Sequence, residues 1–383
     1  MRPAPTPDLD AFERALDALR AEVDARLGPA DTAHLARIEA LGRACAVLGL
    51  AACWFGVNVF AVVLLSLGTF VRWAIVAHHV THGGYDKVPN TPPRYRSKVF
   101  GRSGRRFIDW LDWMAPEAWR QEHNVAHHYR LGELADPDQP EENLEWLRRS
   151  RLPLVVRRAI VLLLSVLWKP VYYAPNTWNA LENHRSRHDA AALTLTQLFF
   201  APEGRGRLRE VVRRCWIPYP LWRFGVLPLP FLLVSADLYG AALINLLLAE
   251  LLTNAHAFWV IVPNHAGDDL LRFDGPATTR AERLYRQIVG STNYGCGRDS
   301  VDVWHGWLGY QIEHHVWPDL TLLQYRWIQP RLQSLCREHG IPYVQESVWL
   351  RMKKTMDVLT GVATMPRNTL PGEVSGSGVV PQA

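Results

Sequence analysis

An apolar stretch that runs directly into a histidine cluster sets the fold of this chain. Residues 44–77 read ACAVLGLAACWFGVNVFAVVLLSLGTFVRWAIVA, and residues 78–82 follow as HHVTH. Between Arg43 and Arg72 lie 28 residues without a formal charge, whereas a helix needs only about 20 apolar residues to cross a bilayer. The stretch therefore fits one long membrane helix or two shorter ones that turn near residues 56–58, and we assign it as a hairpin.

A second apolar region spans residues 216–263, and Ser235-Ala236-Asp237 is its most polar break. This pattern predicts a second membrane hairpin. Residues 159–168 form a shorter apolar run of ten residues behind two arginines, which is too short to span. Trp168 ends that run, and aromatic side chains gather at membrane interfaces. We therefore expect this run to lie at the interface.

The distribution of basic residues predicts the orientation in the membrane. Residues 78–215 hold 22 of the 42 lysines and arginines, whereas the two expected hairpin turns hold none. By the positive-inside rule, residues 78–215 are cytoplasmic. The net charge of +5 therefore reflects topology, and we expect no nucleic-acid partner.

The five cysteines show no C-x-x-C spacing, so they predict neither a disulfide framework nor a zinc ribbon.

The N-terminal residues carry an amphipathic pattern rather than a secretory signal. Apolar residues recur every three or four positions from Leu9 to Leu27, which predicts one helix that ends at Gly28-Pro29. Asp31 is a candidate cap for a second helix. The apolar stripe could pack on the rest of the protein, bind a partner helix or lie on the membrane surface, and we favour internal packing.

Three short windows contain eight of the 15 histidines. They are His78-His79-Val80-Thr81-His82, His123-Asn124-Val125-Ala126-His127-His128 and Gln311-Ile312-Glu313-His314-His315. A spacing of four residues places two imidazoles on one helix face, and neutral imidazole is a ligand for iron, zinc and copper. Because a single catalytic metal commonly takes about three protein ligands, eight or nine histidines predict two metal ions.

The three windows resemble the histidine boxes of the membrane-bound fatty acyl desaturases and hydroxylases. His78/His82, His123/His127/His128 and Gln311/His314/His315 match the family pattern in turn. Tyr310-Gln-Ile-Glu-His-His315 and Asp136-Pro137-Asp138 look like the front-end desaturase version. The resemblance covers about residues 44–345 and implies a diiron centre with O2 as the oxidant.

The resemblance also implies a set of metal ligands. Relatives use a further histidine just after the fourth span, and His265 stands there, with His256 as its rival. His79 competes with His78 for the first ligand position, and we prefer His78 for its spacing. The predicted metal ligands are His78, His82, His123, His127, His128, His265, His314 and His315. Further candidates, as ligands or as hydrogen-bond partners of the ligands, are His79, Gln311, Glu122, Asp138, Glu313 and His305.

The resemblance implies a desaturase that inserts a carbon–carbon double bond into a fatty acyl chain. A hydroxylase with the same iron core is the alternative, followed by a zinc membrane hydrolase and a metal transporter. The chain contains no His-Pro-Gly-Gly haem motif, so we expect a separate electron donor of the ferredoxin or cytochrome b5 type with its reductase. The double-bond position, the acyl carrier and the donor are not readable from the sequence.

These inferences combine into one expected architecture. The chain is an all-α membrane protein with four transmembrane helices as two hairpins and a cytoplasmic helical cap that carries a dimetal site. We expect it in a bacterial inner membrane, with the metals on the cytoplasmic side. The expected segments are residues 1–43 (cytoplasmic amphipathic helices), 44–77 (first hairpin), 78–215 (cytoplasmic, boxes one and two), 216–263 (second hairpin), 264–365 (cytoplasmic, box three) and 366–383 (disordered tail).

Overall fold

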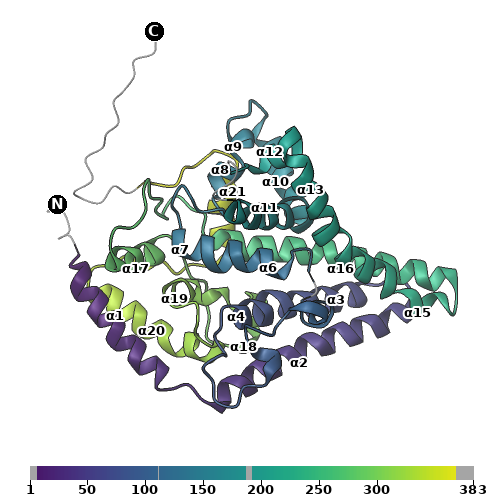
Figure 1. Cartoon of the computed structure of the whole chain (residues 1–383), viewed down its shortest axis with the longest axis horizontal. Helices are drawn as coiled ribbons and strands as arrows, with labels where there is room; N and C mark the ends of the chain where they lie inside the picture. The colour runs from purple at the N-terminus through teal and green to yellow at the C-terminus, as the bar shows by residue number, and fades with distance from the viewer. Residues whose placement is uncertain (1–6, 111, 187–191, 368–383) are drawn as a thin grey trace, which may run out of the picture.

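The computed structural model describes residues 7–110, 112–186 and 192–367, which fold into helices joined by loops (Figure 1). Within these ranges no β-strand forms, and the extended pairings there are isolated bridges such as Arg272 with Arg367. The predicted all-helical class is confirmed. Three helices are long and apolar enough to cross a membrane, namely Pro29–Phe55, Val59–Thr81 and Ala236–Asn264.

The first apolar stretch forms a helical hairpin. Helix α2 (Pro29–Ala52) leads through a short 3₁₀ turn to Gly56, whose φ of 82° suits glycine. Helix α3 (Val59–Phe70) then returns, and the Asn58 side chain caps it by accepting from the backbone N–H of Ala61 at 2.9 Å. The turn near residues 56–58 is therefore where the sequence placed it.

The start of this hairpin differs from the prediction. Helix α2 runs without a break through residues 43 and 44, so the expected segment boundary falls inside one helix. Arg43, which bounded the apolar stretch, pairs with Glu39 one turn earlier, with Arg43 Nη2 2.6 Å from Glu39 Oε1. Asp31 lies inside the first turn rather than at the cap, and its carboxylate accepts from the backbone N–H of Gly28 at 2.9 Å.

The second apolar region is a hairpin with unequal arms. Helix α16 (Ala236–Ile261) is one continuous arm, and Ser235 caps it by accepting from Leu238 N at 3.1 Å. The other arm is a series of short turns, because prolines at 218, 220, 228 and 230 remove backbone N–H donors. Its pieces are α14 (Pro218–Pro220), a π-helical turn (Leu221–Val226) and α15 (Leu229–Leu232). The four-span arrangement thus remains a prediction.

The tips of the two hairpins lie at the same end of the molecule, at the right of Figure 1. Asn245 of α16 joins them, since its Oδ1 accepts from Asn58 N at 3.0 Å and its Nδ2 donates to Gly56 O at 2.9 Å. Large apolar side chains near this end are exposed, among them Phe55 at 86% and Leu233 at 90%. Such an apolar surface suits contact with lipid.

The remaining helices lie outside the two hairpins. Helix α10 (Leu154–Trp168), which contains the short apolar run, packs along α16, where Asn254 Nδ2 donates to Val166 O at 3.1 Å. The other helices are α4 (His78–Thr81), α5 (Arg106–Asp109), α6 (Pro116–Trp119), α7 (His128–Arg130), α8 (Pro140–Asn143), α9 (Glu145–Arg148), α11 (Ala174–Arg185), α12 (Leu195–Phe200), α13 (Arg205–Val211), α17 (Arg280–Val289), α18 (Asp299–Trp304), α19 (Gln311–Val316), α20 (Leu322–Glu338) and α21 (Val348–Leu359).

The N-terminal helix α1 (Leu9–Asp24) packs internally, as we favoured. It lies against α17 and α20, and its apolar stripe, which includes Phe12, Leu16 and Val23, is buried. At the other end of the chain, Pro366 O accepts from Arg272 N at 2.9 Å, so the expected disorder does not begin at residue 366. Residues 368–383 of that expected tail lie outside the described residues.

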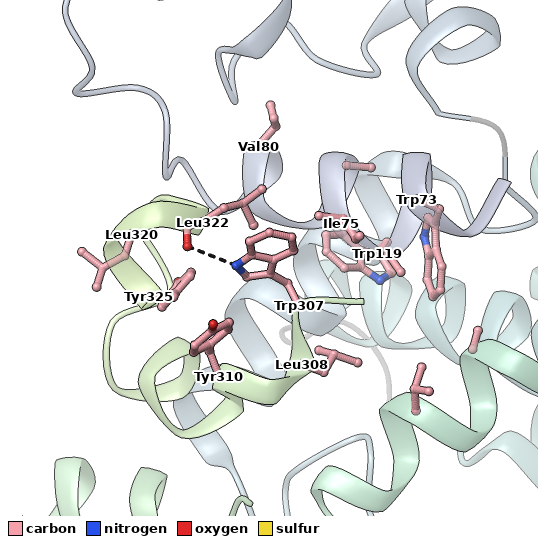
Figure 2. Packing of buried hydrophobic residues seen from close by; sticks show 14 of the residues in the cluster. Trp73, Ile75, Val80, Trp119, Trp307, Leu308, Tyr310, Leu320, Leu322 and Tyr325 are labelled. Atoms are coloured by element: carbon pink, nitrogen blue, oxygen red, sulfur yellow. Dashed lines mark hydrogen bonds between the residues drawn. The ribbon is translucent and has the colours of Figure 1, made fainter. Parts of the chain in front are cut away.

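A core of aromatic side chains supports the third histidine box. Figure 2 shows Trp307, Tyr310 and Tyr325 gathered around the turn that leads to α20, with the Trp307 indole donating to Leu322 O at 3.1 Å. All three aromatic side chains are almost fully buried. Each aromatic side chain buries a large apolar area. This packing therefore holds box three in place against the first hairpin.

Candidate metal centre

The three boxes sit on short helical segments that continue longer elements. Box one follows α3 through a π-helical segment (Val71–Ala77) into α4. Box two occupies a π-helical segment (Arg120–His127) and α7, and box three lies on α19. His265 follows a 3₁₀ turn at the end of α16. Two of these segments are π-helical, a rare conformation that is frequent at functional sites.

The structure brings all eight predicted ligands together in two groups. In each group one nitrogen of every imidazole lies within 4.8 Å of those of the others. The five-histidine cluster contains His78, His82, His123, His128 and His314. The three-histidine cluster contains His127, His265 and His315.

Unpartnered ring nitrogens, which do not depend on the sequence pattern, also indicate that the five-histidine cluster suits a metal ion. The Nε2 atoms of His82, His128 and His314 are buried, and none of these three atoms has a hydrogen-bond partner. A buried polar atom without a partner is costly, and a metal ion would satisfy several of them at once. In the same cluster, His78 Nε2 and His123 Nε2 lie 3.0 Å apart, the separation of two nitrogens at a right angle on one ion with bonds of about 2.1 Å.

The opposite ring nitrogens of box three are held by side chains from other helices. His314 Nδ1 lies 3.0 Å from Tyr325 Oη, which itself donates to Trp317 O at 2.8 Å, so the imidazole is the donor to Tyr325. His315 Nδ1 donates to Gln287 Oε1 at 2.9 Å. Both contacts leave the Nε2 atom free to bind metal, which is the usual role of such partners.

Box two has a carboxylate partner, although not the one that the sequence favoured. His127 Nδ1 lies 2.9 Å from Asp136 Oδ1, and both side chains are buried. Asp136 is itself held by the backbone N–H groups of Gly132 and Asp138, at 3.0 and 2.9 Å. The Asp138 carboxylate lies close to the nitrogens of His123 and His127 and accepts from Tyr172 at 3.4 Å.

The other acidic candidates make no hydrogen bond to an imidazole. The Glu313 carboxylate accepts from Asn293 Nδ2 at 2.8 Å and from Tyr343 Oη at 2.7 Å. Both oxygens of Glu122 are buried without a hydrogen-bond partner. As the hydrogen-bond partner of an imidazole, the expected Glu122, Asp138 and Glu313 are corrected to Asp136, whose oxygen lies at a ring nitrogen. Asp138 stays a predicted candidate ligand beside His123 and His127.

Gln311 takes a place beside the three-histidine cluster. Its amide nitrogen lies 2.9 Å from His265 Nε2, and its amide oxygen is buried without a partner. The side chain can therefore orient His265 or turn its oxygen toward a metal ion, since the two ends of an amide exchange places by a simple flip. Of the two histidines at the end of α16, only His265 reaches a cluster.

Three histidines considered from the sequence lie outside both clusters. His79 Nδ1 bonds to Ile75 O of the preceding turn at 2.8 Å. His256 Nε2 bonds to Trp304 O at 2.8 Å while its ring stacks on Phe70. His305 Nδ1 bonds to Gly295 O at 3.2 Å, so its expected contact with the ligands is not present. Each of these rings already satisfies a nitrogen with a nearby carbonyl.

Burial controls the protonation of the ligand set. Desolvation lowers the pKa of His123, His128, His314 and His315 well below the ordinary value, so these imidazoles are neutral at physiological pH and able to bind metal. Burial also acts to lower the pKa of His127, but the negative charge of Asp136 outweighs it and raises that pKa. The three-histidine cluster thus has an anionic hydrogen-bond partner at His127.

Fold and site together define a helical membrane protein with two buried histidine clusters suited to metal. The family model for fatty acid desaturase matches residues 54–347, and the chain belongs to this family. It is 25% identical over 372 residues to an NADPH-dependent stearoyl-CoA 9-desaturase of Mycobacterium tuberculosis, an alignment that covers 92% of this chain and 79% of that protein.

Shorter similarities link the chain to plant enzymes. It is 30% identical over 105 residues to Delta(8)-fatty-acid desaturase 2 of Arabidopsis thaliana, covering 27% of this chain and 22% of that protein. It is 34% identical over 83 residues to an acyl-lipid (9-3)-desaturase of Borago officinalis, covering 22% and 18%. The chain is accordingly a membrane fatty acid desaturase, an oxidoreductase of lipid metabolism.

Sequence reasoning missed two of the residues that orient the site. Gln287 and Tyr325 lie on α17 and α20, 28 and 11 residues from the histidines that they contact. Neither carries a local motif, so only tertiary contact identifies them. Asp136 did carry a signal, the Asp-Pro-Asp sequence after box two, but spacing alone did not show which of its two acids faces an imidazole.

Proposed function

We propose that this protein is an oxygen-dependent desaturase that inserts a double bond into a fatty acyl chain at a non-haem diiron centre. The observation that carries the proposal is the division of eight histidines, six of them buried and His82 and His265 half-buried, into two clusters, each compact enough for one ion. The five-histidine and three-histidine clusters would each hold one iron ion. His78 is favoured over His79, since the ring of His79 is already bonded to Ile75 O.

Bound iron would supply oxidation of an unactivated C–H bond, so that a –CH2–CH2– unit, O2, two electrons and two protons give –CH=CH– and two water molecules. The protein holds the ligand rings and sets their tautomers through Tyr325, Gln287 and Asp136. It also excludes bulk water, because every histidine of the five-histidine cluster except His82 is less than a tenth exposed.

The membrane and partner assignments are part of the same proposal. The excess of basic residues in segment 78–215 supports a cytoplasmic site, in a bacterial inner membrane. We propose a separate electron carrier of the ferredoxin or cytochrome b5 type, because no haem-binding His-Pro-Gly-Gly sequence occurs in the chain. The substrate is an acyl chain whose carrier the test below distinguishes.

Two measurements test the proposal. Metal analysis of purified protein should give about two iron ions per chain, and about one zinc ion without iron would contradict it. Expression in a host, followed by mass spectrometry of acyl-CoA and of acyl lipids separately, should give a product lighter by two hydrogens in one pool. A product that gains oxygen instead would identify a hydroxylase.

A further inference from the structure

A small chamber lies beside the three-histidine cluster, and one of the predicted ligands lines it. Its walls include Gln139, Asp138 and Met365, and His265 forms one side. The volume open to the centre of a water-sized sphere is about 10 Å³, which is about the space of one water molecule. The chamber is therefore too small for an acyl chain and fits a molecule of two or three atoms.

The chamber is polar in the way that a water site requires. Gln139 is only 3% exposed, and both its amide oxygen and its amide nitrogen lack a hydrogen-bond partner. His265 Nδ1 is likewise buried and without a partner. A buried water needs two to four polar partners, and these side chains offer a donor and acceptors around one space.

The chamber borders a larger opening toward solvent. Arg272 lines both the chamber and a groove of about 250 Å³, whose walls also include Arg148, Thr364 and Gly361. The side chains of the groove are mostly charged, so the groove is filled by solvent. The groove and the chamber therefore adjoin at Arg272, and His265 of the three-histidine cluster lines the chamber.

The C-terminal segment 361–367 borders both the groove and the chamber. Arg148 fastens it by donating to Ala363 O and Thr364 Oγ1, both at 3.3 Å, and Met365 N donates to Glu141 Oε1 at 3.2 Å. The Met365 side chain is 4% exposed and packs against Leu270 and Val358. An unbranched, flexible thioether can change rotamer to open a narrow gap without disturbing its neighbours.

We infer that the chamber is a water site and that Met365 closes the passage by which water, dioxygen and similar small neutral molecules move between solvent and the three-histidine cluster. The inference rests on the proposed function, which consumes dioxygen and releases water at a buried centre. Gln139 holds the water in the chamber, and the 361–367 segment keeps larger molecules out.

The binding rate of nitric oxide to the reduced, iron-loaded protein tests the passage, because nitric oxide is a neutral probe of the size of dioxygen. Met365→Trp fills the opening and should slow association by at least about tenfold, as expected when entry requires a rearrangement. Met365→Ala should bind at least as fast as the unchanged protein. Val362→Trp places the same bulk on an exposed position of the segment and should leave the rate unchanged.

Iron content is measured first in every variant, so that two kinds of failure are separated. Unchanged association in iron-loaded Met365→Trp overturns the passage while the diiron proposal stands. If Met365→Trp does not load iron, the rate of nitric oxide association with Met365→Ala tests the passage instead. Slower association with Met365→Ala would contradict the role of Met365 in closing the passage. Absence of iron from the unchanged protein overturns the proposed function, and the passage with it.

Discussion

The two histidine clusters share box two and box three but are built differently. The five-histidine cluster takes every ligand from the three boxes and has the aromatic ring of Trp119 stacked on His123 at a centroid distance of 4.5 Å. The three-histidine cluster needs His265 from outside the boxes and has Gln311, Asp136 and a water-sized chamber around it. One cluster has five histidines, and the other has three histidines with an amide and a carboxylate in contact with them.

The two clusters therefore differ in how many histidines could hold an ion and in how much room remains for small molecules. The five imidazoles would hold an ion through more ligands than the three imidazoles would. A shell of three imidazoles leaves positions for small molecules, and the nearby carboxylate and amide compensate for the missing rings. We therefore expect the three-histidine cluster to be the more sensitive to loss of one group.

The largest expected effect comes from removing a ligand of the smaller cluster. His315→Ala leaves two of its three histidines and should reduce product by more than about 100-fold, with about one metal ion lost per chain. Desaturated product and metal content measure this. The exposed His184 gives the control His184→Ala, which should retain both, and equal losses in the two variants would refute the ligand assignment.

A second prediction compares the groups that orient one histidine in each cluster. Asp136→Asn weakens the contact to His127, and Tyr325→Phe removes the contact to His314. Each should lower metal affinity by about 10- to 100-fold, with the greater loss for Asp136→Asn, because it also removes a charge. Metal titration of the purified variants measures both. A greater loss for Tyr325→Phe would reverse the order that the comparison implies.

A third prediction makes the clusters more alike. Gln311→His would place a fourth imidazole beside His265, so the smaller cluster should retain metal longer against a chelator. The gain should be about a few-fold, because the ring must fit a site shaped for an amide. Gln311→Ala is the matched control and should lose metal faster. Equal chelation rates in both variants would show that position 311 does not face the metal.

The smallest effect is expected far from both clusters, where α1 fastens the segment after box three. Although burial acts to raise it, Arg20 and Lys87 lower the pKa of Asp319 from 3.8 to about 2. A lowered pKa stabilises the fold above pH 3.8, and that contribution is lost as the pH falls toward 2. Arg20→Ala should therefore lower the free energy of unfolding by about 1 kcal/mol or less at neutral pH.

Chemical denaturation in detergent at several pH values measures this effect. The difference between Arg20→Ala and the unchanged protein should narrow as the pH falls from 4 toward 2, where Asp319 takes up its proton. Metal content at neutral pH should not change, since Arg20 contacts neither cluster. A loss of metal would mean that α1 controls the geometry of the clusters.

Much of the site was readable because its chemistry is local. Spacing along a helix paired His78 with His82, and the five-histidine cluster contains both, whereas His123 and His127, also four residues apart, fall into different clusters. The hairpin turn at residues 56–58 was readable for a similar reason, since apolar length and a glycine mark it. The expected boundary between residues 43 and 44 falls inside α2, where Glu39 and Arg43, one turn apart, neutralise each other.

Sequence by itself determined the helical membrane class, the two apolar regions and the eight histidines that come together, since periodicity and hydrophobic length act within short segments. Only the tertiary structure decided how these histidines divide into five and three, that Asp136 rather than Asp138 holds His127, and that Tyr325 and Gln287 orient box three. Those choices depend on distances between side chains that are remote along the chain, and packing alone sets such distances.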